Sequence, residues 1–160
     1  MKDKILSLTI QNLKADGLRF SVDELAKELR ISKKTIYKYF PSKEALAKEV
    51  FSTYFREVTK EILDYAKNNP KDHYGFLLRY ADTFWTLEES LFNKFQLQES
   101  IRELAFSLHQ ELERTLSPYF MENESLRFIL NSTLFGMEKA KLKQEDRVDV
   151  LQNLTKLWTL

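Results

Sequence analysis

A run of cations and hydroxyls between residues 32 and 43 has the composition of a surface that contacts phosphates and base edges. The run reads SKKTIYKYFPSK and holds four lysines, two tyrosines, a threonine and two serines. Lysine ammonium groups pair with phosphates or with the acceptor edge of guanine, and hydroxyls serve either partner. A lysine-rich surface alone favours a plain solvated face, so the spacing of these residues has to decide.

The spacing predicts a short helix with one buried face and one donor-rich face. Ile36 and Phe40 are i, i+4 neighbours and share the buried face. At about 100° per residue, Lys34, Thr35 and Lys38 point most nearly away from that face. Tyr37 and Tyr39 fall on the two flanks of the same helix. A helix lying in the major groove of DNA needs this layout, with donors over the bases and flanking groups over the phosphates.

Two short helices are expected to position these groups. Ser21 and Glu24 have the spacing of a capping box, and an apolar stripe follows them. Ser32 is a candidate N-cap for the second helix, over residues 33–40, and Pro41 stops it. Arg30 and Ile31, which separate the two helices, leave room only for a sharp turn. Two short helices joined by so short a turn are typical of the helix-turn-helix motif.

The stretch TIYKYFPSKEAL resembles the signature of the TetR-type family of bacterial transcriptional regulators, and the resemblance covers roughly residues 4 to 55. It implies that Lys33, Lys34 and Thr35 face bases, while Tyr37, Tyr39 and Lys43 hold the DNA backbone. The full set of DNA-binding residues that we predict is Ser21, Ser32, Lys33, Lys34, Thr35, Tyr37, Lys38, Tyr39 and Lys43.

Two residues depart from the family's pattern. Arg30 occupies the turn where the family usually has glycine, and a left-handed backbone there costs arginine on the order of 1 kcal/mol. Lys34 stands where glycine or proline is common and adds a charge to the reading face. Both departures keep open an alternative function, a protein-interaction adaptor that uses the same fold without binding an operator or an effector.

Composition excludes several classes of protein. The 160 residues include no cysteine and only three glycines and three prolines, which removes thiol chemistry, zinc–cysteine sites and glycine-rich phosphate loops. No window approaches the roughly 18 apolar residues of a membrane helix, and the N-terminus does not read as a signal peptide, so we expect a cytoplasmic protein without a membrane partner. Residues 1–50 hold 11 basic and 7 acidic side chains, and the rest hold 14 and 17. A basic end on a slightly acidic body suits a DNA-reading head.

Hydrophobic periodicity predicts an all-α chain: a three-helix N-terminal helix-turn-helix head, joined by a long fourth helix to a C-terminal helical bundle. We expect a DNA-binding domain at residues 1–45 and a regulatory and dimerisation domain at 46–160. The expected helices run 2–16, two over the helix-turn-helix, then 43–67, 72–87, 89–117, 122–141 and 145–159.

Aromatic residues concentrate in the expected fifth and sixth helices. In the family that this chain resembles, the central helices enclose an effector pocket, so one hypothesis is an apolar cavity for a small-molecule effector. Its predicted lining is Tyr80, Phe84, Trp85, Phe95 and Phe106. The alternative is a filled aromatic core, because aromatic stripes at helical spacing usually pack.

The last two helices are apolar over much of their circumference, and Gly136 lies in the middle of the first of them. The resemblance favours a homodimer built on a four-helix interface, with tentative contacts through Ile129, Thr133, Gly136, Met137, Leu151, Leu154 and Trp158. The alternative is that these helices only close the core of one chain.

The sequence contains no recognisable set of catalytic residues. His73 and His109 have no carboxylate at ligand spacing, and no serine or threonine has a base-and-orienter context. We therefore expect no cofactor, no metal and no enzyme. The prediction is a sequence-specific transcriptional regulator, a repressor that binds a palindromic operator in double-stranded DNA as a homodimer and is released by a small apolar effector.

Overall fold

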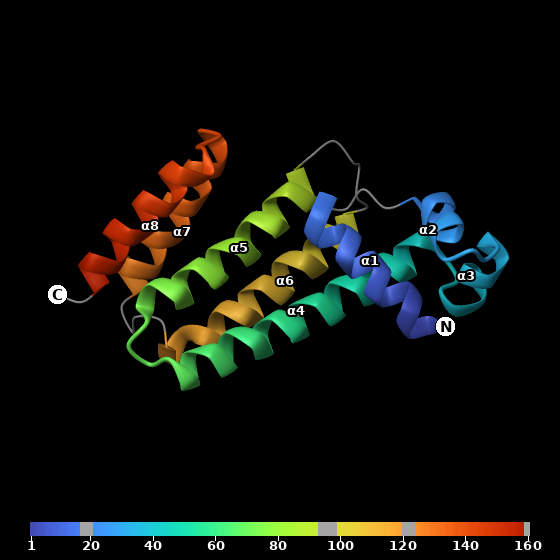
Figure 1. The fold of residues 1–160 in the computed structure, drawn as a ribbon, viewed down its shortest axis with the longest axis horizontal. Coiled ribbons are helices and arrows are strands. Elements are labelled where there is room, and N and C mark those ends of the chain that lie inside the picture. Colours follow the sequence, from blue (N-terminus) through green and yellow to red (C-terminus); the bar gives the residue numbers. More distant parts are fainter. Residues whose placement is uncertain (17–20, 93–98, 120–123, 159–160) are drawn as a thin grey trace. The chain divides into compact units, whose positions relative to one another are not determined.

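The computed structural model describes residues 1–16, 21–92, 99–119 and 124–158. These residues form eight α-helices and one 3-10 turn, and none of them lies in a strand (Figure 1). The all-α prediction is therefore confirmed. The helices are α1 (Lys2–Asp16), α2 (Val22–Glu28), α3 (Lys33–Tyr39), α4 (Lys43–Asn68), α5 (His73–Phe92), α6 (Glu99–Leu116), α7 (Glu124–Lys139) and α8 (Gln144–Trp158), with the 3-10 turn at Ser117–Tyr119.

The chain divides into two compact units. Unit 1 comprises residues 1–57 and 86–110, and unit 2 comprises residues 58–85 and 111–160. The three longest helices, α4, α5 and α6, each supply residues to both units. These two units are defined by which residues pack together. The boundary expected at residue 45 separates a DNA-binding domain from a regulatory domain by function, and it stays a prediction.

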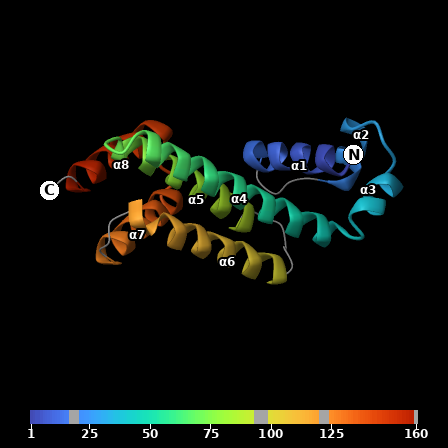
Figure 2. The ribbon, with the colours of Figure 1, turned by 90° about the horizontal axis from the view of Figure 1, so that it is seen from below.

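Unit 1 has a core made by the first four helices. Each helix contributes fully buried apolar side chains, among them Ile5, Leu13, Leu25, Ile36, Leu46, Val50 and Phe51. The α1 helix crosses the first half of α4 (Figure 1 and Figure 2). Lys2 fastens the two helices, because its Nζ lies 2.9 Å from Glu49 Oε1 and 5.6 Å from the centre of the Phe40 ring. These contacts join α1 and α4, the two helices that flank the helix-turn-helix in sequence.

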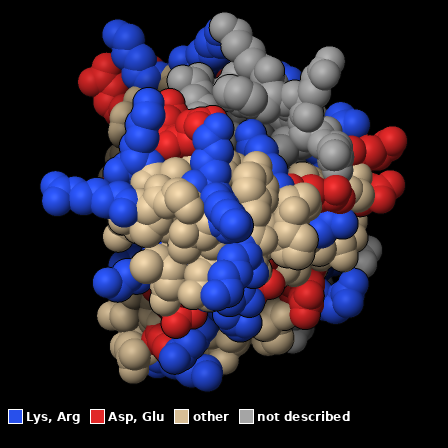
Figure 3. Space-filling model, turned by 90° about the vertical axis from the view of Figure 1, so that its right-hand side faces the viewer, with Lys and Arg blue, Asp and Glu red and all other residues tan. Residues whose placement is uncertain are grey.

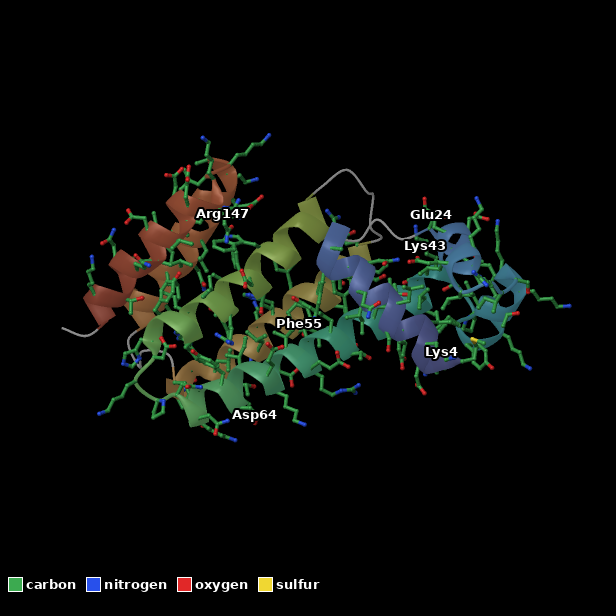
Figure 4. All side chains as sticks on the ribbon, viewed as in Figure 1. Lys4, Glu24, Lys43, Phe55, Asp64 and Arg147 are labelled. Carbon is green, nitrogen blue, oxygen red and sulfur yellow. The ribbon has the colours of Figure 1, made fainter. Side chains whose placement is uncertain are left out.

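Unit 2 packs the second half of α4 with α5, the end of α6, α7 and α8. Its fully buried side chains include Ile62, Leu77, Tyr80, Leu112, Leu116, Leu134 and Leu151. Arg147 of α8 stacks its guanidinium 4.7 Å from the centre of the Trp85 ring on α5 and pairs with Glu138 on α7 at 2.9 Å (Figure 4). One arginine therefore links three helices of this unit.

One expected helix boundary is wrong. The sequence predicted a break between residues 87 and 89, but α5 runs through this point to Phe92, and α6 begins only at Glu99. Residues 88–92 read EESLF and contain no glycine or proline, so nothing in them opposes helix propagation. The stop predicted at Gly17 lies outside the described residues, whereas Pro118 lies in the 3-10 turn that ends α6 as expected.

Candidate nucleic-acid interface

Both helices of the helix-turn-helix begin at the predicted caps. The Ser21 Oγ accepts the N–H of Asp23 at 3.1 Å, and the Ser32 Oγ accepts the N–H of Thr35 at 3.1 Å. The hydroxyls of Ser32 and Thr35 also hydrogen-bond each other at 2.9 Å. The Ser21 oxygen bonds the residue before Glu24, so among the described residues the capping box is not completed and Ser21 acts as a simple cap.

The turn between the helices is a Schellman motif with a left-handed residue. Arg30 has φ 53°, which confirms the strained backbone that the sequence suggested. The N–H of Ile31 donates to Ala26 O at 2.9 Å, and the N–H of Arg30 donates to Lys27 O at 3.1 Å. These two bonds satisfy carbonyls at the end of α2 and fix the direction in which the chain enters α3.

The α3 helix has the two faces that its spacing predicted. Ile36 and the capping residue Phe40 are buried, whereas Tyr37 and Tyr39 are 43% and 39% exposed. Lys33, Lys34 and Lys38 are exposed as well, and Thr35 is half-buried. Lys and Arg side chains gather on this end of the chain with carboxylates among them (Figure 3). Large polar side chains with exposed donors over a firm apolar base suit contacts with a charged groove.

The three lysines of α3 differ in their surroundings. Lys33 Nζ forms an ion pair with the Asp23 carboxylate on α2, and this hydrogen bond raises the pKa of Lys33 above its usual value. Among the described residues, neither Lys34 nor Lys38 has a hydrogen bond or ion pair. The charge of Lys33 is therefore paired with Asp23, whereas those of Lys34 and Lys38 are unpaired among the described residues.

The start of α4 carries the remaining predicted contact. Ser42 caps this helix by accepting the N–H of Ala45 at 3.0 Å, and the exposed Lys43 is its first residue (Figure 4). The neighbouring Glu44 accepts the hydroxyl of Ser100 at 2.8 Å and pairs with Lys48 at 3.0 Å. These contacts lower the pKa of Glu44, with the Ser100 hydroxyl as the first cause. They tie the beginning of α6 to the beginning of α4.

Comparison with known proteins agrees with this geometry. Residues 5–50 match the family model described as bacterial regulatory proteins, tetR family. The N-terminal head is a TetR-family domain. No curated protein matches the chain. This domain supports a DNA-binding transcriptional regulator, and the matched segment contains α2, α3 and the start of α4 that carries Lys43.

The predicted effector-pocket residues lie in different places. Tyr80, Phe84 and Trp85 are buried on α5 in unit 2. Phe106 belongs to unit 1 and is 45% exposed, so it does not line the interior of that unit. Phe95 lies outside the described residues. Among the described members, only the three α5 aromatics share a buried environment.

The interior of unit 2 also contains a polar cluster that sequence reasoning missed. The Tyr80 hydroxyl lies 2.9 Å from Asn131 Oδ1 and 3.2 Å from Glu113 Oε1, and Asn131 Nδ2 donates to the same Glu113 oxygen. Burial raises the pKa of Tyr80 well above its usual value, and the Glu113 charge adds to this effect. The three side chains come from α5, α6 and α7, and no local spacing relates them.

The predicted dimer-interface residues need revision. Met137 and Leu151 are buried within unit 2, so they supply no free surface, while Thr133 and Leu154 are half-buried. The side chain of Trp158 lies outside the described part of the chain. Of the predicted residues, Ile129 (47%) and Gly136 are exposed on α7, and this helix also exposes Phe128 (73%) and Phe135 (43%), which were not in the predicted set.

Three further features of the described part of the chain concern a metal site, a reactive histidine and a membrane-spanning helix. No group of three potential metal ligands occurs there. His109 is buried with its ring 6.3 Å from the Phe55 ring in an edge-on contact, an arrangement of packing. No described helix is long and apolar enough to cross a membrane.

Proposed function

We propose that two copies of this chain bind one palindromic operator as a homodimer and repress transcription, and that a small apolar effector releases the DNA. One observation carries the proposal: α3 buries Ile36 and Phe40 beneath an outward face of lysines and tyrosines, inside a TetR-family domain. A recognition helix needs one face packed against the rest of its domain and hydrogen-bond donors on the face that enters the groove.

The proposed contacts divide into two kinds. Lys33, Lys34, Thr35 and Lys38 face bases and set sequence preference. Lys34, Thr35 and Lys38 project from the side of α3 away from its buried residues, and the resemblance to TetR-type regulators implies the same role for Lys33. The other contacts hold the sugar–phosphate backbone and set overall affinity: Ser21, Ser32, Tyr37, Tyr39 and Lys43. Exposure of Tyr37 and Tyr39 supports this division, since tyrosine hydroxyls on the flanks of α3 can donate to phosphate oxygens.

The homodimer is proposed through α7 and α8. Exposed Phe128, Ile129 and Phe135 support it, because they make α7 apolar where the described residues of unit 2 do not cover it. No atom of the described residues lies within 4 Å of the position that a Cβ of Gly136 would take, so a second helix could pack beside it. A twofold axis would pair this face with itself, and twofold heads read palindromic DNA.

The proposed release mechanism is a population shift. An effector that binds better to one conformation of the regulatory domain changes the spacing of the two heads, so they no longer match both half-sites. The buried aromatics Tyr80, Phe84 and Trp85 support an apolar effector. A filled core is the competing explanation, and calorimetry with candidate apolar ligands separates the two.

The decisive experiment selects bound duplexes from a random DNA pool. The proposal expects an enriched motif with twofold symmetry. It also expects Tyr37→Ala and Lys43→Ala to weaken binding to all sequences, and loss of the Lys43 contact to lower the salt slope by about one. Lys60→Ala, an exposed lysine of α4 in unit 2, is the matched control. Salt-insensitive, non-saturating binding without an enriched motif would favour the adaptor instead.

A further inference from the structure

The ion pair between Asp23 and Lys33 places a carboxylate beside the reading face of α3. Phosphates repel a carboxylate, so an acid at this position weakens general attraction to DNA. An exposed ion pair also adds little to stability. The pair therefore has no evident benefit for either folding or general affinity.

Asp23 and Lys33 both lie in the first turn of a helix whose start is held by a side-chain cap. Asp23 is the second residue of α2, and its own N–H is held by the Ser21 cap at 3.1 Å. Lys33 is the first residue of α3, and the turn before it is closed by the Ser32 cap on Thr35 at 3.1 Å. Because the aspartate side chain is short, its carboxylate sets where the long lysine side chain places its ammonium group.

The ion pair leaves part of the ammonium group free. A lysine ammonium has three donors, and the carboxylate occupies one of them. Two donors remain for O6 and N7 of a guanine, the acceptor pair that lysine reads in the major groove. Lys34, the next residue, has no such ion pair among the described residues.

We propose that Asp23 is a positioning residue for sequence specificity, which holds Lys33 for a guanine edge and withholds it from phosphates. The inference rests on the proposed docking of α3 in the major groove. In this arrangement the pair contributes no net charge to non-specific binding, and the proposed backbone contacts supply the general attraction. Specificity rises because non-specific binding loses a contact that operator binding keeps.

The test compares Asp23→Asn with Glu24→Gln. Both variants remove one negative charge from neighbouring exposed positions of α2, and only Asp23 is paired with Lys33. Asparagine keeps the size of the side chain, and the Ser21 cap bonds the backbone of residue 23, so the fold is retained. Far-ultraviolet circular dichroism checks the fold of each variant.

Three readouts distinguish positioning from simple charge. Relative to Glu24→Gln, Asp23→Asn should raise affinity for a random-sequence duplex three- to ten-fold. It should steepen the salt dependence by about 0.9, the value for one added phosphate contact. In selection from a random pool, it should lose the guanine preference at one position of each half-site. Lys33→Gln should lose the same preference, and in that background Asp23→Asn should change no base preference further.

The outcomes separate this inference from the proposed function. If the unaltered protein enriches no twofold motif, the proposed function fails first. If it enriches a motif, but Asp23→Asn and Glu24→Gln give the same affinity, salt slope and base preferences, then Asp23 acts only through its charge and the inference is overturned.

Discussion

The left-handed residue between α2 and α3 provides a quantitative test of the backbone argument. Arg30 has φ 53°, and its two Schellman hydrogen bonds involve only backbone atoms, which glycine also has. Arg30→Gly removes about 1–2 kcal/mol of strain between the Cβ and the backbone. Glycine loses about 0.5–1 kcal/mol more backbone entropy on folding. The free energy of unfolding should therefore rise by about 0.5–1 kcal/mol.

Urea unfolding followed by circular dichroism measures this change, and the thermal midpoint should rise by about 1–4 °C. Arg30→Ala is the matched control, because it removes the same charge and side chain but keeps the strain. Lys141, with φ 51°, ends α7 in the same motif, and its bonds run from Leu142 to Met137 at 3.1 Å and from Lys141 to Glu138 at 3.0 Å. Lys141→Gly should give a similar gain.

The opposite sign is expected inside the helix. Lys27→Gly, in α2, should lower the free energy of unfolding by about 1 kcal/mol, since glycine is a poor helix former where φ is negative. If Arg30→Gly proves no more stable than Arg30→Ala, the strain argument is refuted, whatever the absolute stabilities are.

Further predictions concern unit 2. Tyr80→Phe should lower the free energy of unfolding by about 1–2 kcal/mol, because it deletes the single hydroxyl donor that Asn131 and Glu113 share, whereas exposed Tyr39→Phe should change it by less than about 0.5 kcal/mol in the same urea titration. The raised pKa of Tyr80 stabilises the fold fully below about pH 10, where unfolded tyrosine begins to ionise, and this contribution falls as pH rises further. Urea midpoints between pH 8 and 11 should therefore decline less steeply in Tyr80→Phe, and parallel curves would contradict this. Asp72→Ala should cost about 1 kcal/mol in thermal unfolding, because its carboxylate caps α5 at 2.9 Å, and an unchanged midpoint would contradict the capping role. Ile129→Glu should turn the proposed dimer into a monomer in light scattering at micromolar concentration, and a persistent dimer would move the interface elsewhere.

Local features of the head could be predicted because they depend on residues close in sequence. The caps at Ser21 and Ser32 and the strain at Arg30 all follow from interactions spanning a few residues. The outward face of α3 follows from helical periodicity about Ile36 and Phe40. The capping partner of Ser21 differed by one residue, which is within the variation of N-cap geometry.

Features of the body could not be predicted in the same way. The break expected near residue 88 is absent, because adjacent acids do not stop a helix that other residues favour. On α7 the sequence showed two apolar faces but not which of them the chain itself covers. Packing buries Met137 and leaves Phe128 exposed, and periodicity gives equal weight to both.

The amino-acid sequence by itself determined an all-α chain, a capped helix-turn-helix and the donors on its reading helix, because each depends on local propensity and period. Only the tertiary structure decided that Asp23 holds Lys33, that Tyr80 meets Glu113 and Asn131, and that Phe128, Ile129 and Phe135 remain exposed. These pairings join residues from separate helices, and their formation depends on how the helices pack, which no single segment of sequence specifies.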